Sequence, residues 1–167
     1  MPKKEIHIRK IKYQTPDYNK ELILRDQVLR KPLGMSLFDE NLVGEINDYH
    51  IGAFIHDKLV GILILTPLNA DTVKMRQVAV DETFQSQKVG SRLVHFAEQF
   101  SKNKEYSMIV LNARKSAIPF YLKLGYEKIS DEFLEINIPH YKMSKSIQYK
   151  AFILLDSSKV LKKSVNN

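Results

Sequence analysis

A polar segment between a predicted strand and a predicted helix has the residue types of an anion-binding site. Its seven members are Gln85, Ser86, Gln87, Lys88, Val89, Gly90 and Ser91. Short or absent side chains let a ligand approach the backbone, and the first peptide N–H groups of a helix lack intrahelical partners. Because Lys88 adds a positive charge, the segment predicts a site for a diphosphate. An ordinary helix start, with a glycine for close packing, is the alternative.

A pair of aromatic residues, Phe120 and Tyr121, lies on a later predicted helix. This helix is expected to begin at Ser116 as its N-cap, to carry Pro119 in its first turn and to end before Gly125. A phenol with its ordinary pKa of about 10 is protonated at neutral pH and can donate a proton. The alternative is a pair of core aromatics on an amphipathic helix.

The other ionisable residues offer several roles. Arg25 is either a ligand for an anionic acceptor or a structural ion-pair partner, and His140 either lines the acceptor site or bonds to the backbone. Candidates for a general base, besides a water chain, are Glu40, Glu45, His50, Glu135 and His140. The chain has no cysteine, which excludes thiolate nucleophiles, disulfides and thiolate metal sites. No two of its five histidines are four residues apart, so no metal is expected.

The composition is that of a globular protein with excess positive charge. The 167 residues are 44% hydrophobic and 27% charged, and 26 basic against 19 acidic residues give a net charge of +7. This charge permits an anionic partner, although a lysine-rich solvated surface is the simpler interpretation. Neither a signal peptide nor a membrane-spanning run is expected, which predicts a cytoplasmic protein with no membrane partner.

Periodicity predicts an α+β fold with one strand–helix–strand crossover near its centre. The expected order is β, α, β-β-β, α, β, α, β-β, in a mixed central sheet of about six or seven strands with flanking helices. The expected strands are residues 6–11, 49–55, 59–65, 72–80, 106–111, 126–135 and 141–147. The expected helices are residues 18–30, 89–100 and 116–124, with one short helical turn within 36–48. Residues 1–147 are expected to form one domain, and 148–167 are expected to form an extension that is first apolar and then polar.

Two motifs on this framework resemble the GNAT superfamily of N-acetyltransferases. They are Gln85-x-x-x-x-Gly90 after a strand and, beyond Asn112, Phe120-Tyr121-x-x-x-Gly125-Tyr126 on a helix. The sequence departs from the family pattern at Lys88, where the first glycine of the loop is usual. A narrower likeness to the ElaA-type branch rests on Leu24-Arg25-x-x-Val28, Gln87-Lys88-Val89-Gly90 and Ile138-Pro139-His140-Tyr141-Lys142-Met143.

The resemblance implies acetyl-CoA as the donor and assigns roles to residues. Val78, Ala79 and Val80 would pair with the pantetheine arm and point a backbone N–H at the thioester carbonyl. The segment 85–91 would hold the pyrophosphate, Asn112 would bond the pantetheine amides, and Phe120 belongs to the same coenzyme-binding motif. Tyr121 would protonate the departing thiolate.

The function implied is direct acetyl transfer from acetyl-CoA to a primary amine of a small molecule or a protein, with no cysteine relay. A non-catalytic GNAT module that binds the coenzyme is one alternative. A basic nucleic-acid-binding domain is another, but most aromatics fall at core-periodic positions, so no nucleic acid is expected. A homodimer is compatible with the sequence.

Overall fold

The alternating segments form one mixed sheet of eight strands in the computed structural model, which describes residues 4–147. The strand order is β1-β2-β3-β4-β5-β8-β6, with β7 paired to β8, and the β4–β5 pair is parallel. The strands are β1 (Ile6–Ile11), β2 (Tyr49–Ile55), β3 (Lys58–Pro67), β4 (Thr72–Val80), β5 (Met108–Arg114), β6 (Glu127–Lys128), β7 (Phe133–Glu135) and β8 (Ile138–Ser146).

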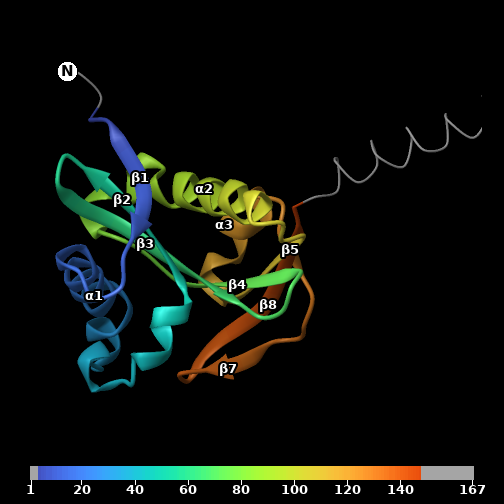
Figure 1. Cartoon of the computed structure of the whole chain (residues 1–167). Helices are drawn as coiled ribbons and strands as arrows, with labels where there is room; N and C mark the ends of the chain where they lie inside the picture. The colour runs from blue at the N-terminus through green and yellow to red at the C-terminus, as the bar shows by residue number, and fades with distance from the viewer. Residues whose placement is uncertain (1–3, 148–167) are drawn as a thin grey trace, which may run out of the picture.

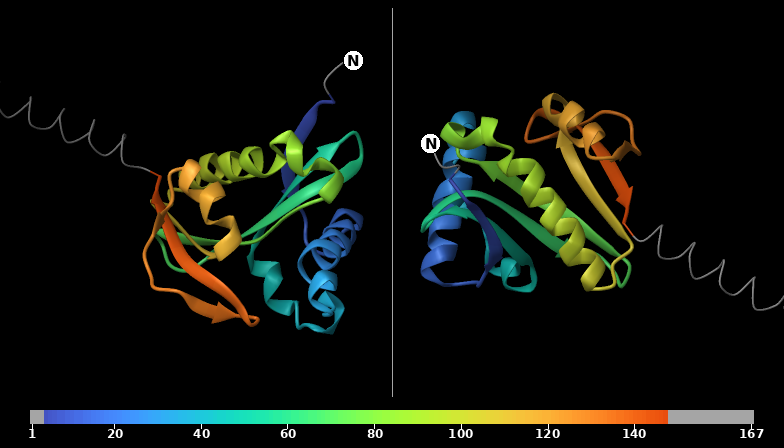
Figure 2. Two further views of the ribbon diagram at one scale, coloured as in Figure 1. Left: turned by 180° about the vertical axis from the view of Figure 1, so that it is seen from behind. Right: turned by 90° about the horizontal axis from the view of Figure 1, so that it is seen from above.

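Helices cover both faces of this sheet, as Figures 1 and 2 show. The α-helices are α1 (Pro16–Leu29), α2 (Val89–Asn103) and α3 (Ile118–Lys123). Short 3-10 turns connect them to the strands: η1 (Lys31–Leu33), η2 (Leu37–Asp39), η3 (Val43–Asn47), η4 (Glu82–Gln87) and η5 (Lys115–Ala117). One core lies between the sheet and α2, where Leu93 and Ala97 are buried, and a second lies beneath α1, where Tyr18 and Leu24 are buried. The fold is therefore the predicted α+β arrangement with two covered faces.

Several predicted boundaries are wrong. Residues 126–135 form two short strands, β6 and β7, rather than one, which brings the sheet to eight strands. Residues 36–48 contain two 3-10 turns rather than one, and β5 ends at Arg114, because its pairing with β8 continues to Arg114 opposite His140. Ser116 is not an N-cap, since the 3-10 turn η5 precedes α3. The predicted extension, 148–167, lies outside the described residues.

The parallel β4–β5 ladder is short, and the two strands diverge beyond it. It joins residues 72–75 to residues 108–111 and ends at Met75 opposite Leu111, although both strands continue. A β-bulge lies in β4 just beyond this point: Ile64 opposes Arg76 and Ile62 opposes Ala79, so β4 carries one extra residue. Gln77, within the bulge, has a φ of 54°, in the left-handed region. The sheet therefore opens between β4 and β5.

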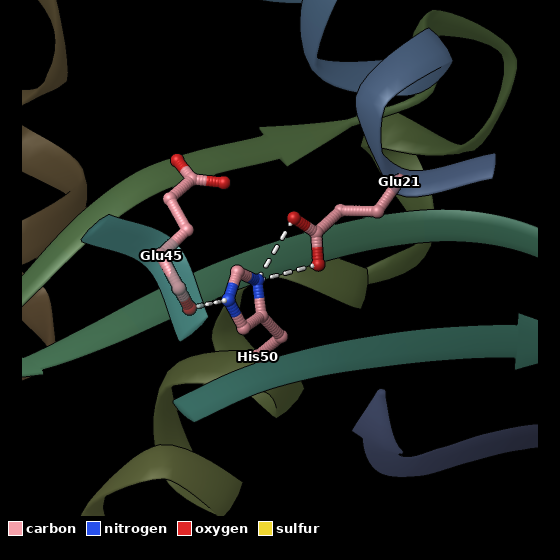
Figure 3. Close-up of side chains that lie close together, drawn as sticks. All are labelled: Glu21, Glu45 and His50. Atoms are coloured by element: carbon pink, nitrogen blue, oxygen red, sulfur yellow. Dashed lines mark hydrogen bonds and ion pairs between the residues drawn. The ribbon is translucent and has the colours of Figure 1, made fainter. Parts of the chain in front are cut away.

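A buried ionic network lies beneath the bulge and joins α1, η3 and β2. The Arg25 guanidinium, 1% exposed, donates to Glu45 at 2.8 and 2.7 Å and to Glu21 at 3.0 Å. His50 Nδ1 lies 2.9 Å from both carboxylate oxygens of Glu21, and its Nε2 donates to the backbone oxygen of Glu45 at 2.9 Å (Figure 3). Tyr18 donates its hydroxyl proton to Glu45 at 2.7 Å. Two carboxylates thus face one guanidinium and one imidazolium.

The pKa directions agree with this charge balance. Burial by itself would raise the pKa of Glu45. The pKa is nevertheless lowered, because Arg25 donates hydrogen bonds to this carboxylate and carries a positive charge beside it. Burial would likewise lower the pKa of His50, but its hydrogen bond to Glu21 and the charge of that carboxylate raise it. Both shifts therefore favour the charged form of the group in the folded protein.

Replacing Arg25 with methionine should destabilise the protein strongly, because it leaves two buried carboxylates facing one cation. We expect a loss of about 3 kcal/mol in the free energy of unfolding, measured by urea denaturation. Lys20→Met is the matched control, since Lys20 is half-exposed and pairs with Asp17 at 3.6 Å. Its loss should stay below about 1 kcal/mol. Equal losses in the two variants would contradict the role of the network.

The free energy of unfolding should also depend on pH through His50. Because its folded pKa is raised above the ordinary value of 6.5, its contribution is complete below pH 6.5 and is lost as pH rises through the folded pKa. Urea denaturation from pH 6 to pH 9 should show this loss in the wild type and not in His50→Gln. The exposed His95→Gln variant should follow the wild type. A wild-type curve parallel to that of His50→Gln would refute the assignment.

Candidate active site

A cleft opens where β4 and β5 diverge, and it reaches both faces of the sheet. Its lining includes Val78 at the bulge, Asn112 on β5, Tyr121 on α3 and Glu135 on β7. Neighbouring residues of a strand point to opposite faces. Met75 and Leu111 belong to the core beneath α2, so Asn112 faces the other side of the sheet. The cleft thus has an α2 side and an α1 side.

Tyr121 lies on the α2 side, from where it lines the cleft. It is 7% exposed, and burial raises the pKa of its phenol to about 12. Its ring lies 5.0 Å from that of Phe120 and 5.8 Å from that of Tyr126, both edge-on. Gly125 ends the helix with a φ of 90°, as predicted for a C′ glycine. The phenol is therefore neutral near pH 7 and lies next to the open strands.

The first turn of α2 adjoins this side of the cleft. A Cβ built on Gly90 would lie 3.4 Å from Cζ of Phe120, so α3 packs against the start of α2. Lys88, the N-cap residue, has a φ of 60° and makes no side-chain cap. Gln85 anchors the loop by donating to the backbone oxygen of Val80 at 3.1 Å. The first N–H groups of α2 thus remain available to an anion.

Backbone groups of β4 complete the α2 side. Ala79 and Val80 pair with β3, opposite Ile62 and Gly61. On its other edge, β4 pairs with β5 only as far as Met75, among residues 4–147. The segment Val78, Ala79 and Val80 therefore presents an edge to which an extended ligand can add.

A hydrogen-bonded group occupies the α1 side. Asn112 donates its amide Nδ2 to Glu135 at 3.2 Å, and His140 Nε2 lies 3.3 Å from the other oxygen of that carboxylate. His140 Nδ1 donates to the backbone oxygen of Ile138 at 2.7 Å, which fixes the ring so that Nε2 faces Glu135. Glu135 is thus a carboxylate oriented by two neighbours at the edge of the cleft.

Some candidates from the sequence lie elsewhere. Arg25 is not an acceptor ligand, because its guanidinium is buried and committed to Glu21 and Glu45. Glu45 and His50 belong to the same buried network, which removes them as general bases at the cleft. Glu40 is paired with Arg30 at 2.7 Å. Glu135 and His140 are the remaining acid–base candidates, and both line the cleft.

The buried cluster of Glu21, Glu45 and His50 also has the composition of a metal site. Its donor atoms are already engaged: Arg25 holds both carboxylates, and both ring nitrogens of His50 make hydrogen bonds. Arg25 and the imidazolium supply the positive charge that a metal would bring. The cluster is accordingly an ionic network of the core.

Sequence reasoning missed the basic residues around Glu135. They are Arg30, Lys74, Arg76 and Arg114. The alternation along β4 could have indicated two of them, because the polar residues Lys74 and Arg76 flank Met75, which is buried. It places both side chains on the α1 side, together with Asn112. The bulge at Gln77 has no comparable signal in residue type.

Within residues 4–147, no helix is both long and apolar enough to cross a membrane.

The chain spans about half the length of the curated relatives that it matches. The Uncharacterized N-acetyltransferase YjcF of Bacillus subtilis is 36% identical over 73 residues, 43% of this chain and 52% of the relative. The Uncharacterized protein YyaT of the same organism is 33% identical over 76 residues, 46% of this chain and 51% of the relative.

Solved structures share the fold over most of the chain. A putative N-acetyltransferase from Lactobacillus plantarum has a TM-score of 0.75 at 18% identity and covers 85% of this chain and 98% of its own. Escherichia coli ElaA has a TM-score of 0.71 at 20% identity, with coverages of 85% and 100%. An aminoglycoside 6'-N-acetyltransferase complexed with coenzyme A has a TM-score of 0.70 at 19% identity, with coverages of 84% and 97%.

The resemblance noted in the motifs agrees with this fold and with a direct family match. A family model described as an acetyltransferase (GNAT) domain matches residues 14–147, which is nearly the whole described chain. An open β4–β5 edge and a buried phenol lie in one cleft within that range, and the uncapped start of α2 packs against Phe120, the neighbour of that phenol. The chain belongs to the GNAT acetyltransferase family.

Proposed function

We propose that this protein transfers an acetyl group from acetyl-CoA directly to a primary amine. The observation that carries the proposal is the cleft itself, which has a neutral phenol, Tyr121, on one side of the sheet and an oriented carboxylate, Glu135, on the other. Family membership supports acetyl-CoA as donor, and one fold neighbour is a complex with coenzyme A. We place the protein in the cytoplasm.

The donor would bind on the α2 side. The pantetheine arm would add to the open edge of Val78, Ala79 and Val80, and the pyrophosphate would lie at the first turn of α2, beside Gly90 and Lys88. Gln85, Ser86, Gln87, Val89 and Ser91 complete this loop. Phe120 would pack against the coenzyme. Asn112, which faces the α1 side and donates to Glu135, would reach the pantetheine through the opening between β4 and β5. The uncapped start of α2 supports this placement.

In the reaction, the neutral amine attacks the thioester carbonyl carbon, so that a C–N bond forms and the C–S bond breaks. A backbone N–H near the bulge would stabilise the carbonyl oxygen as it gains charge. Tyr121 would give its proton to the departing sulfur, since a phenol with a pKa of about 12 remains protonated until a thiolate forms beside it.

Glu135 would take the proton that the amine loses. Asn112 and His140 hold its two oxygens at 3.2 and 3.3 Å, which orients the carboxylate toward the α1 side of the cleft. His140 would act as a positioning residue, because its Nδ1 is fixed by the Ile138 carbonyl. The acceptor would therefore approach from the α1 side.

Replacing Tyr121 with phenylalanine should lower turnover about 100-fold, because the variant removes the proton donor and keeps the ring. Thiol release from acetyl-CoA, with a panel of primary amines, measures turnover. The thermal shift produced by coenzyme A should equal that of the wild type. Tyr13→Phe, outside the cleft, is the matched control. Normal turnover in Tyr121→Phe would refute its role, and a wild type that binds coenzyme A but acetylates no amine would instead be a coenzyme-binding module.

Replacing Glu135 with glutamine should lower kcat/KM about 100-fold, because the amide cannot accept the proton. Glu132→Gln is the matched control, since Glu132 is exposed and pairs with Lys115 at 3.1 Å. The measurement is kcat/KM for a primary amine at one fixed pH. An unchanged kcat/KM would show that another group or a water chain deprotonates the amine.

A further inference from the structure

The α1 side of the cleft carries more positive than negative charge. Four basic residues line it around Glu135: Arg30, Lys74, Arg76 and Arg114. Arg30 is the N-cap residue of η1, Lys74 and Arg76 lie on β4, and Arg114 is the last residue of β5. The pairing of β4 with β5 therefore brings three of them to one region of the sheet. Alternation places Lys74 and Arg76 on the same face as Asn112. Positively charged side chains therefore surround the Glu135 carboxylate.

Two of these cations are already paired. Arg30 donates to Glu40 at 2.7 and 3.2 Å, and Arg76 lies 3.7 Å from Asp48. Within the described range, 4–147, neither Lys74 nor Arg114 has a carboxylate within 4.0 Å. Glu135 itself faces His140. The cleft thus offers two uncompensated cations next to one carboxylate.

We propose that the acceptor is a small primary amine that also carries an anionic group, a carboxylate or a phosphate. This inference rests on the proposed function. The amine would lie at Glu135, and its anionic group would meet Lys74 or Arg114, which have charge to neutralise. Diamines and polyamines would instead bring a second positive charge to a part of the cleft that basic residues line.

The dimensions of the cleft suit a small molecule. Two adjoining hollows of about 230 and 290 Å³ share Asn112 and Glu135. This size is near the lower limit of roughly 300 Å³ for small-molecule sites. A molecule with an amine and an anion separated by two or three carbons is small enough for these hollows.

The test compares four amines of similar length by thiol release from acetyl-CoA. The probes are 3-aminopropanoate, 2-aminoethyl phosphate, propylamine and 1,3-diaminopropane. We expect kcat/KM to be at least about tenfold higher for an anionic amine than for propylamine, and lowest for the diamine. The first two probes distinguish a carboxylate from a phosphate. The anionic advantage should shrink as salt rises, since salt screens charge.

Variants test the cations directly. At least one of the variants Lys74→Gln and Arg114→Gln should reduce the preference for the anionic amine over propylamine about tenfold, as expected for a lost charge-assisted hydrogen bond. Lys12→Gln is the matched control, since Lys12 is exposed and outside the cleft lining. An unchanged preference in both cleft variants would overturn the inference.

The outcomes separate this inference from the proposed function. Equal or better use of propylamine or the diamine would overturn the acceptor class and leave acetyl transfer intact. If no probe is acetylated, calorimetry with 3-aminopropanoate and 2-aminoethyl phosphate on protein saturated with coenzyme A decides. Binding weakened by Lys74→Gln or Arg114→Gln supports the inference, whereas no binding, or binding that neither variant weakens, overturns it. Absence of any thermal shift with coenzyme A would refute the proposed function and this inference together.

Discussion

The site depends on the point at which two parallel strands stop pairing. The β4–β5 ladder ends at Met75 and Leu111, and an extra residue in β4 follows immediately. Without the bulge, Met75 and Ala79 would point to the same face of the sheet. Because of the extra residue, Met75 packs in the core beneath α2 and Ala79 packs in the core beneath α1. A left-handed residue that is not glycine costs about 1 kcal/mol or more, so the surrounding structure must hold Gln77 in place.

The buried network supplies part of that support. Arg25 Nε donates to the side-chain oxygen of Gln77 at 3.4 Å, while its other nitrogens hold Glu21 and Glu45. Helix α1, the turn η3 and strand β2 are thereby fixed to one another beneath the cleft. Buried ion pairs contribute little net stability compared with apolar packing, but removing one partner is costly. Such a network favours one arrangement of these segments over others.

Local residue patterns predicted most of the fold, and the family resemblance of two motifs predicted one side of the site. Strand alternation located the β2–β3–β4 meander, and the helix expected over residues 18–30 largely coincides with α1. The motif around Tyr121 identified a phenol that lies in the cleft. The partners of Arg25 could not be predicted, because they lie up to 52 residues away in the chain and depend on how separate elements pack. The bulge likewise arises from pairing between strands rather than from residue type.

The opening between β4 and β5 passes from one face of the sheet to the other, with Tyr121 and Glu135 on different sides. In the proposed reaction, thioester and amine would therefore use separate entrances and could occupy the protein at the same time. A ternary complex of this kind gives sequential rather than ping-pong kinetics, and neither substrate has to leave before the other arrives.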